Sequence, residues 1–87
     1  MPVVLDGARM CDRAALHDHL TQQLNLPDYY GRNLDALYDM LTERQMPVTV
    51  RIENVACLQE SLGRYAEAFL KTLRDVAAKN PNFKIEG

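Results

Sequence analysis

Three short apolar or alternating stretches, separated by segments with helical periodicity, constrain the fold of this chain most strongly. They cover residues 2–5, 48–53 and 83–85. Strands joined through helices pair in parallel by right-handed crossovers, so this order predicts a small parallel sheet. The middle stretch alternates apolar with polar residues, which indicates one covered and one more polar face. The sequence therefore predicts an α/β fold, a two-layer domain with a three-stranded parallel sheet and helices mainly on one face.

The first two predicted helices have clear start and stop signals. Asp12 can cap a helix over residues 13–25, and Pro27 ends it because the residue before a proline is pushed out of the helical region. The inward stripe of this helix consists of leucines at four-residue spacing, Leu16, Leu20 and Leu24. Asn33 can cap a second helix that ends near Glu43. Its apolar face repeats with helical spacing at Leu34, Leu37, Tyr38 and Leu41.

Two further helices are predicted between the second and third strands. Asn54 can cap a short one, and after Gly63 a longer one runs to Pro81. One face of the longer helix consists of Tyr65, Phe69, Leu73 and Val76. The segment 28–32, which has no period, is predicted to be a loop in which Gly31 takes backbone angles that other residues avoid.

Size and charge exclude several classes of protein. The chain has 87 residues and a formal charge of −2, which predicts one domain over residues 1–87 and argues against direct nucleic-acid binding. Cys11 and Cys57 have no CxxC spacing, so we expect two free thiols, no metal site and no cofactor. Neither an export signal nor a run of 18 apolar residues is present, which predicts a cytoplasmic protein that does not enter a membrane.

The acidity is concentrated on the second predicted helix. Asp35, Asp39 and Glu43 recur at four-residue spacing and form one acidic stripe beside the apolar face. Segment 28–43 sums to −3, whereas the remainder of the chain sums to +1. The stripe has two interpretations: a solvated helix face, which is the ordinary meaning of such a pattern, or a negative binding surface.

Tyrosines beside the acidic stripe favour the binding surface. Tyr29 precedes the helix and Tyr38 lies at the border of its two faces; aromatic rings beside carboxylates are typical of a contact surface for a cationic partner. The alternative for a tyrosine is core packing with the hydroxyl at the rim. Core packing fits Tyr65 and is also open for Tyr30. For Tyr29 and Tyr38, core packing and the binding surface are equally favoured. The loop itself predicts that Tyr30 lies on or near the surface.

No pattern in the sequence supports catalysis. His17 and His19 point about 200° apart on a helix, so they cannot share a metal ion, and we expect both on the solvated helix surface. Asp35 and Asp39 could form an acid/base pair of a small hydrolase, but no nucleophile or phosphate loop accompanies them and an exposed pair lacks a walled cleft. The prediction is that the protein is not an enzyme.

One segment resembles a known family. The run LPDYYGRNLDALYD, residues 26–39, is similar to the signature LPxYYGxNLDALWD of the barstar family of ribonuclease inhibitors. It departs at Tyr38, where the family has tryptophan. The resemblance implies a three-stranded parallel sheet flanked by helices and a cytoplasmic bacterial inhibitor. It also implies a one-to-one complex with a secreted barnase-type ribonuclease, formed by a chain that is monomeric when free.

The resemblance also implies roles for individual residues. Asp39 would be the central anchor at the place of a substrate phosphate, Asp35 would add a second charge, and Tyr29 would pack on the catalytic histidine of the enzyme. The implied contact as a whole consists of Tyr29, Gly31, Asn33, Leu34, Asp35, Tyr38, Asp39, Thr42 and Asp75.

Two positions depart from the best-known member of the family. Arg44 replaces an aromatic residue, where a positive charge would meet a cationic partner unfavourably, and Lys79 replaces an acid near the rim. Both departures suggest either a partner ribonuclease with a different rim or weaker binding to barnase itself. An alternative function keeps the fold but makes it a regulatory module that binds another basic protein.

Overall fold

The computed structural model describes residues 2–86, and its sheet has the predicted number and direction of strands. Strands β1 (Val3–Asp6), β2 (Val48–Glu53) and β3 (Phe83–Glu86) lie side by side in the order β1-β2-β3, and both pairs are parallel. Val50 at the centre of β2 pairs with Val3 on one side and with Ile85 on the other. The predicted three-stranded parallel sheet is confirmed.

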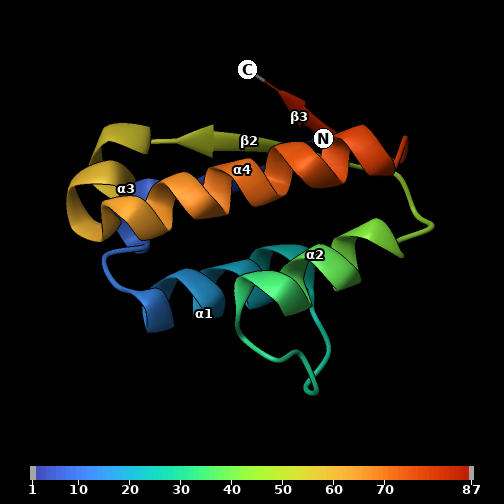
Figure 1. The fold of residues 1–87 in the computed structure, drawn as a ribbon, viewed down its shortest axis with the longest axis horizontal. Helices are drawn as coiled ribbons and strands as arrows, with labels where there is room; N and C mark the ends of the chain where they lie inside the picture. Colours follow the sequence, from blue (N-terminus) through green and yellow to red (C-terminus); the bar gives the residue numbers. More distant parts are fainter. Residues whose placement is uncertain (1, 87) are drawn as a thin grey trace.

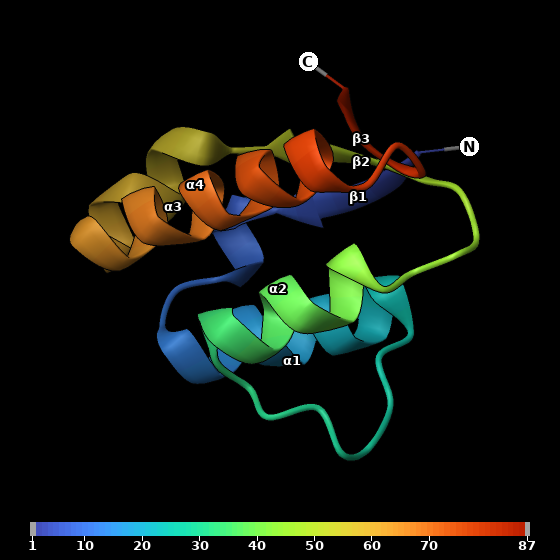
Figure 2. The ribbon, with the colours of Figure 1, turned by 45° about the vertical axis from the view of Figure 1, so that its right-hand side comes forward.

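The helices gather on one side of this sheet (Figures 1 and 2). In chain order they are the short 3-10 helix η1 (Gly7–Arg9), α1 (Arg13–Leu24), α2 (Leu34–Thr42), α3 (Val55–Leu62) and α4 (Arg64–Lys79). The connection between α1 and α2 extends beyond both helices at the bottom of the two views. The predicted helix positions are therefore confirmed to within a few residues.

The two faces of the sheet differ as the alternation in β2 predicts. On the covered face Leu5, Val50 and Phe83 are buried in a single apolar cluster with the leucines of the helices. On the open face the Arg51 guanidinium lies 3.0 Å from the carboxylate of Glu53 and 3.6 Å from that of Glu86. Both ion pairs of Arg51, within β2 and between β2 and β3, are exposed, so they organise a solvated surface and add little to stability.

Two of the three predicted helix caps are confirmed. The Asp12 carboxylate accepts the Ala15 N–H at 2.7 Å, and the Asn33 side-chain oxygen accepts the Ala36 N–H at the same distance. Asn54 does not cap α3 with its side chain, so that prediction is wrong. Its backbone is left-handed, with a φ of 56°, and its side-chain amide donates instead to Asp6 Oδ1 at 2.7 Å.

The histidine prediction is also wrong, because both histidines of α1 are buried. His17 is 2% exposed and His19 is 6% exposed. His19 Nε2 accepts the backbone N–H of Asp6 at 3.0 Å, which ties α1 to the end of β1. Burial, with a smaller effect of a nearby arginine in each case, lowers the pKa of both imidazoles. The folded chain therefore holds both rings neutral, and helical periodicity alone did not reveal their polar partners.

These two histidines predict an acid-sensitive fold. Below about pH 6.5, the ordinary histidine value, the unfolded chain binds protons that the folded chain excludes until a lower pH. We expect the free energy of unfolding to be level at higher pH and to decrease by of order 1 kcal/mol as the pH falls to about 5.5. Urea denaturation at a series of pH values measures this, and the double variant His17→Gln, His19→Gln should have a flatter profile. Equal profiles for the two proteins would contradict the assignment.

Gly7 is needed where η1 meets the end of β2. A Cβ atom at this position would lie 2.2 Å from the backbone oxygen of Asn54, so no side chain fits without a backbone shift. Gly7→Ala should therefore lower the free energy of unfolding by about 1–3 kcal/mol, the usual cost of overpacking. Ala8→Ser at the exposed neighbouring position is the matched control and should be close to neutral. Chemical denaturation that gave the same midpoint for both variants would exclude the close contact.

Within residues 2–86, no helix is long and apolar enough to span a membrane, and no three His, Cys, Asp or Glu side chains are grouped so that they could hold a metal ion. Cys11 and Cys57 are exposed and unpaired in this part of the chain.

Candidate functional site

The acidic stripe lies on the outer face of α2. Asp35, Asp39 and Glu43, which we call the acidic face, are exposed, whereas Leu37 and Leu41 on the opposite side of the helix are fully buried. Among the described residues, none of the three acidic side chains forms an ion pair. Asp35 lies in the first turn, where the helix dipole stabilises a negative charge, but Asp39 lies too far along to benefit. The acidic face thus holds uncompensated charge on a helix whose other side is locked into the core.

The loop before α2 places one tyrosine outside and one inside. Tyr29 is 79% exposed, which makes it the most exposed large apolar side chain among the described residues. Tyr30 is only 5% exposed, and its hydroxyl lies 2.7 Å from His17 Nδ1. The prediction that Tyr30 lies at the surface is wrong, and the core alternative holds for it. Burial raises the pKa of the Tyr30 hydroxyl, so it remains a neutral hydrogen-bonding group.

Arg32, rather than Gly31, has the unusual backbone angles of this loop. The φ of Arg32 is 55°, in the left-handed region that costs a non-glycine residue roughly 1 kcal/mol. Two contacts to α1 hold it there: an ion pair with Asp18 at 2.6 Å and a hydrogen bond to the Ala14 carbonyl at 3.2 Å. The expected role of Gly31 is therefore wrong. It is a place of close approach instead, where an added Cβ would lie 3.1 Å from the Cβ of Ala36.

Other predicted site residues mainly shape the start and the border of α2. Asn33 is exposed and caps the helix, and Leu34 next to it is half-buried. Tyr38 is half-buried at the border of the acidic face, as its position predicts. Thr42 Oγ1 donates back to the Tyr38 carbonyl at 2.8 Å, so its hydroxyl hydrogen is already used within the helix.

Asp75 lies on a different helix. It is exposed on α4, which packs beside α2, and its carboxylate accepts from Lys71 Nζ at 3.0 Å in an ion pair one helical turn apart. Lys79 is exposed at the end of the same helix. The charge of Asp75 is thus partly offset, in contrast to that of Asp39.

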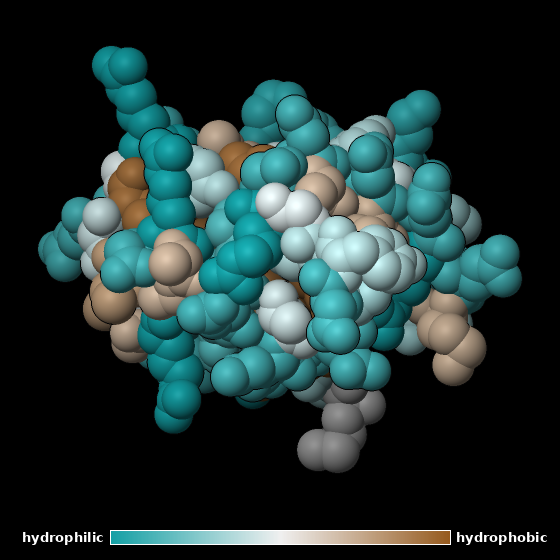
Figure 3. All heavy atoms as spheres, turned by 90° about the horizontal axis from the view of Figure 1, so that it is seen from below, coloured by the Kyte–Doolittle hydropathy of each residue, from teal (hydrophilic) through white to brown (hydrophobic). Residues whose placement is uncertain are grey.

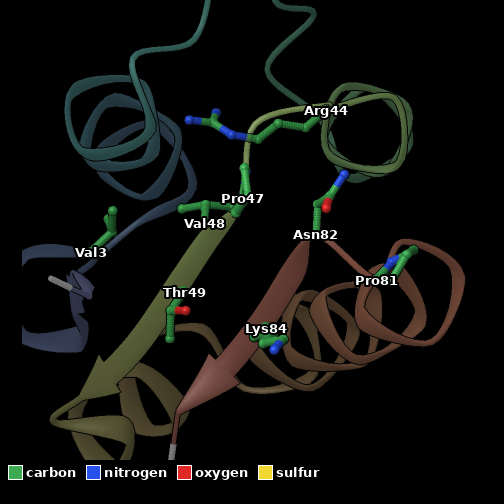
Figure 4. Close-up of a pocket in the computed structure, with 8 residues that line it drawn as sticks. All are labelled: Val3, Arg44, Pro47, Val48, Thr49, Pro81, Asn82 and Lys84. Atoms are coloured by element: carbon green, nitrogen blue, oxygen red, sulfur yellow. The ribbon is translucent and has the colours of Figure 1, made fainter.

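Arg44 is directed into the protein. Its guanidinium donates to the Leu24 carbonyl at 3.2 Å, at the C-terminal end of α1, where a positive charge is favourable. Figure 4 shows the side chain extending beyond Pro47 toward α1, beside a hollow of about 540 Å³ at the amino ends of β2 and β3. The hollow is lined by Val3, Arg44, Pro47, Val48, Thr49, Pro81, Asn82 and Lys84. The acidic face does not line this hollow, and Asp35 and Asp39 are exposed.

One residue that the sequence analysis passed over holds the end of α2 in place. Asn80 is buried, and its side-chain amide donates to the carbonyls of Leu41 and Arg44, both at 2.9 Å. An asparagine before a proline reads as an ordinary helix stop, and nothing in the local pattern reveals that its partners lie more than 30 residues away.

The surface on the side of α1 and α2 is mainly hydrophilic (Figures 1 and 3). Figure 3 views the molecule from below, on the side where α1, α2 and their connecting loop lie, and shows polar side chains with separate apolar spots rather than one apolar patch. Such a surface is suited to recognition by charge and a few anchoring side chains.

Comparison with known proteins identifies the family. Residues 1–86 match the family model described as "Barstar (barnase inhibitor)". The chain belongs to the barstar family. A relative from Bacillus subtilis (strain 168), named "Putative ribonuclease inhibitor YrdF", is 38% identical over 85 residues, which are 95% of this chain and 93% of the relative. The barstar family consists of inhibitors, so the prediction that this chain is not an enzyme is confirmed by its membership.

The internal contact of Arg44 predicts an effect on stability. Arg44→Ala removes the hydrogen bond to α1 and should lower the free energy of unfolding by about 1 kcal/mol, the usual net value of such a bond. Arg74→Ala, which removes an exposed arginine of α4, is the matched control and should be nearly neutral. Urea denaturation of the two variants decides the matter, and an unchanged midpoint for Arg44→Ala would show that its inward contact is not maintained in solution.

Proposed function

We propose that this member of the barstar family inhibits a secreted microbial ribonuclease of the barnase type by inserting the acidic face of α2 and the loop before it into the active site. The observation that carries the proposal is the uncompensated charge of Asp35 and Asp39 on a helix fixed in the core, beside the exposed ring of Tyr29. The complex is one-to-one, and the inhibitor acts in the cytoplasm of the bacterium that secretes the enzyme.

The chemistry of a ribonuclease explains why such a surface binds it. An enzyme that cleaves RNA has a cationic cleft, because it must hold phosphates, and carboxylates on a rigid helix can take the places of those phosphates. The helix is ordered before binding, so little conformational entropy is lost on association. Acidic and basic surfaces also attract each other at long range and accelerate the encounter.

The proposed contact assigns a role to each part of the site. Asp39 is the central anchor and pairs with arginines and a histidine of the enzyme, Asp35 accepts donors from an enzyme loop, and Tyr29 packs on the catalytic histidine. The complete set is Tyr29, Gly31, Asn33, Leu34, Asp35, Tyr38, Asp39, Thr42 and Asp75. Because Lys71 already pairs with Asp75, we infer that Asp75 contributes less than the acids of α2.

To test the proposal, the purified protein is titrated into barnase while the rate of RNA cleavage is measured. The expected result is loss of cleavage at a one-to-one ratio. If neither barnase nor the basic ribonucleases secreted by the source bacterium are inhibited, the proposal is wrong. Recovery of a basic protein that is not a nuclease, bound through Asp35 and Asp39, would instead support a regulatory module.

Two substitutions on the acidic face separate a central anchor from diffuse attraction. Asp39→Ala should weaken binding by at least about 3 kcal/mol, a magnitude carried over from the barnase–barstar pair itself. Glu43→Ala, on the same face one turn further along, is the matched control and should cost less than about 1 kcal/mol. Isothermal titration or inhibition kinetics measures both. Equal losses would show that the charge acts as a whole and that Asp39 is not an anchor.

A further inference from the structure

A buried histidine connects the loop before α2 to the first turn of α4. His17 Nδ1 lies 2.7 Å from the hydroxyl of Tyr30, and its Nε2 lies 2.8 Å from the hydroxyl of Tyr65. Tyr30 belongs to the loop and Tyr65 to the first turn of α4, 48 residues after the histidine. We call these three side chains the tyrosine–histidine relay.

One assignment of the hydrogen bonds in the relay uses all three contacts, including that of the Tyr30 hydroxyl with the Asn33 carbonyl. A neutral imidazole donates from one nitrogen and accepts at the other. The Tyr30 hydroxyl lies within 3.5 Å of the Asn33 carbonyl, so it can donate there while it accepts from His17 Nδ1–H. His17 Nε2 then accepts from the Tyr65 hydroxyl. The relay thus ends at Asn33, the residue that caps α2.

We propose that Tyr65 and His17 are positioning residues for the ribonuclease-binding loop, and that protonation of His17 releases this loop and weakens inhibition at acidic pH. The inference rests on the proposed function. Tyr30 stands between Tyr29 and Gly31, so a relay that fixes the Tyr30 side chain also fixes the backbone that presents the exposed ring of Tyr29.

The charges around His17 oppose its protonation. Burial and the cation of Arg32 lower its pKa, and the carboxylate of Asp18 raises it, but Asp18 is itself paired with Arg32 at 2.6 Å. From α4 the Tyr65 ring faces the imidazole, and the Arg13 guanidinium lies 4.2 Å from the centre of that ring. A protonated His17 would be a buried cation beside the charge of Arg32, and the nearby carboxylate of Asp18 is already paired with that arginine. Water would stabilise the charged ring, and movement of Tyr30 with its loop would expose the ring to water.

Tyr65→Phe tests the relay without any ribonuclease. The substitution keeps the ring under Arg13 and removes only the hydroxyl that donates to His17. Thr72→Val is the matched control, since it removes a hydroxyl of α4 that bonds within the helix, to the Ala68 carbonyl at 2.8 Å. NMR of the free protein follows hydrogen exchange of the Tyr30 amide, which donates to the Pro27 carbonyl at 3.0 Å, and the titration of the His17 ring.

The expected result is specific to the relay. In Tyr65→Phe the Tyr30 amide should exchange roughly three to ten times faster, the effect of one hydrogen bond, and His17 should titrate at a higher pH. Thr72→Val should leave both readouts unchanged. Wild-type values for both readouts in Tyr65→Phe would overturn the positioning role.

Binding to barnase tests the consequence for inhibition. The quantity to compare across pH is the dissociation constant of Tyr65→Phe divided by that of wild type, because protonation of the enzyme changes both constants equally and cancels in this ratio. It should be roughly three to ten near pH 7.5 and should approach one as the pH falls and His17 of the wild type is protonated. A ratio independent of pH would overturn the release by protonation. If barnase is not bound at all, the proposed function fails toward that enzyme, whereas the NMR readouts still decide the relay.

Discussion

The buried side chains of this three-stranded sheet, Leu5, Val50 and Phe83, all lie on one face, and the rest of the molecule depends on that arrangement. The open face of β2 and β3 has charged side chains, and the buried apolar residues lie between the covered face and the helices. α2 takes part in this core through Leu37 and Leu41 and packs beside α4. Its opposite side is left facing solvent, and this is the side on which Asp35 and Asp39 lie. A minimal core therefore gives a rigid support to a highly charged surface.

Rigidity at this surface comes from several parts of the chain. Asn33 fixes the first turn of α2, and Asn80 at the end of α4 holds the carbonyl of Leu41 in the last turn and that of Arg44 just after the helix. The loop before α2 is fixed by α1, through Arg32 and through His17. These polar contacts add little to global stability, since each is worth about 1 kcal/mol, but together they define one conformation for the backbone next to the acidic face.

Local patterns predicted the sheet, the helices and the acidic face, because period, capping and turn residues act over a few positions. They failed where a side chain is defined by a distant partner. The local pattern places His17 on the surface of α1, but the structure pairs it with Tyr65 of α4. The local pattern also makes Asn54 a helix cap, whereas its side-chain amide donates to Asp6. Gly31 and Arg32 show the same limit at shorter range: the left-handed position goes to the residue that Asp18 can hold by its charge, not to the glycine. The site itself was visible because a family signature covers it, and its solvated interpretation could not be dismissed from spacing alone.

The two contacts that hold the loop before α2 against α1, one through Arg32 and one through Tyr30, differ in chemistry. The pair of Arg32 with Asp18 is exposed and holds a strained backbone, so it weakens as ionic strength rises, whereas the contact of Tyr30 with His17 is buried and insensitive to salt. Mild acid protonates His17 and so breaks its contact with Tyr30. It leaves the ion pair of Arg32 with Asp18 intact. Neither salt nor mild acid alone removes both. Acid therefore frees the Tyr30 side of the loop while Arg32 stays paired with α1, and salt loosens the Arg32 side while Tyr30 stays in the core.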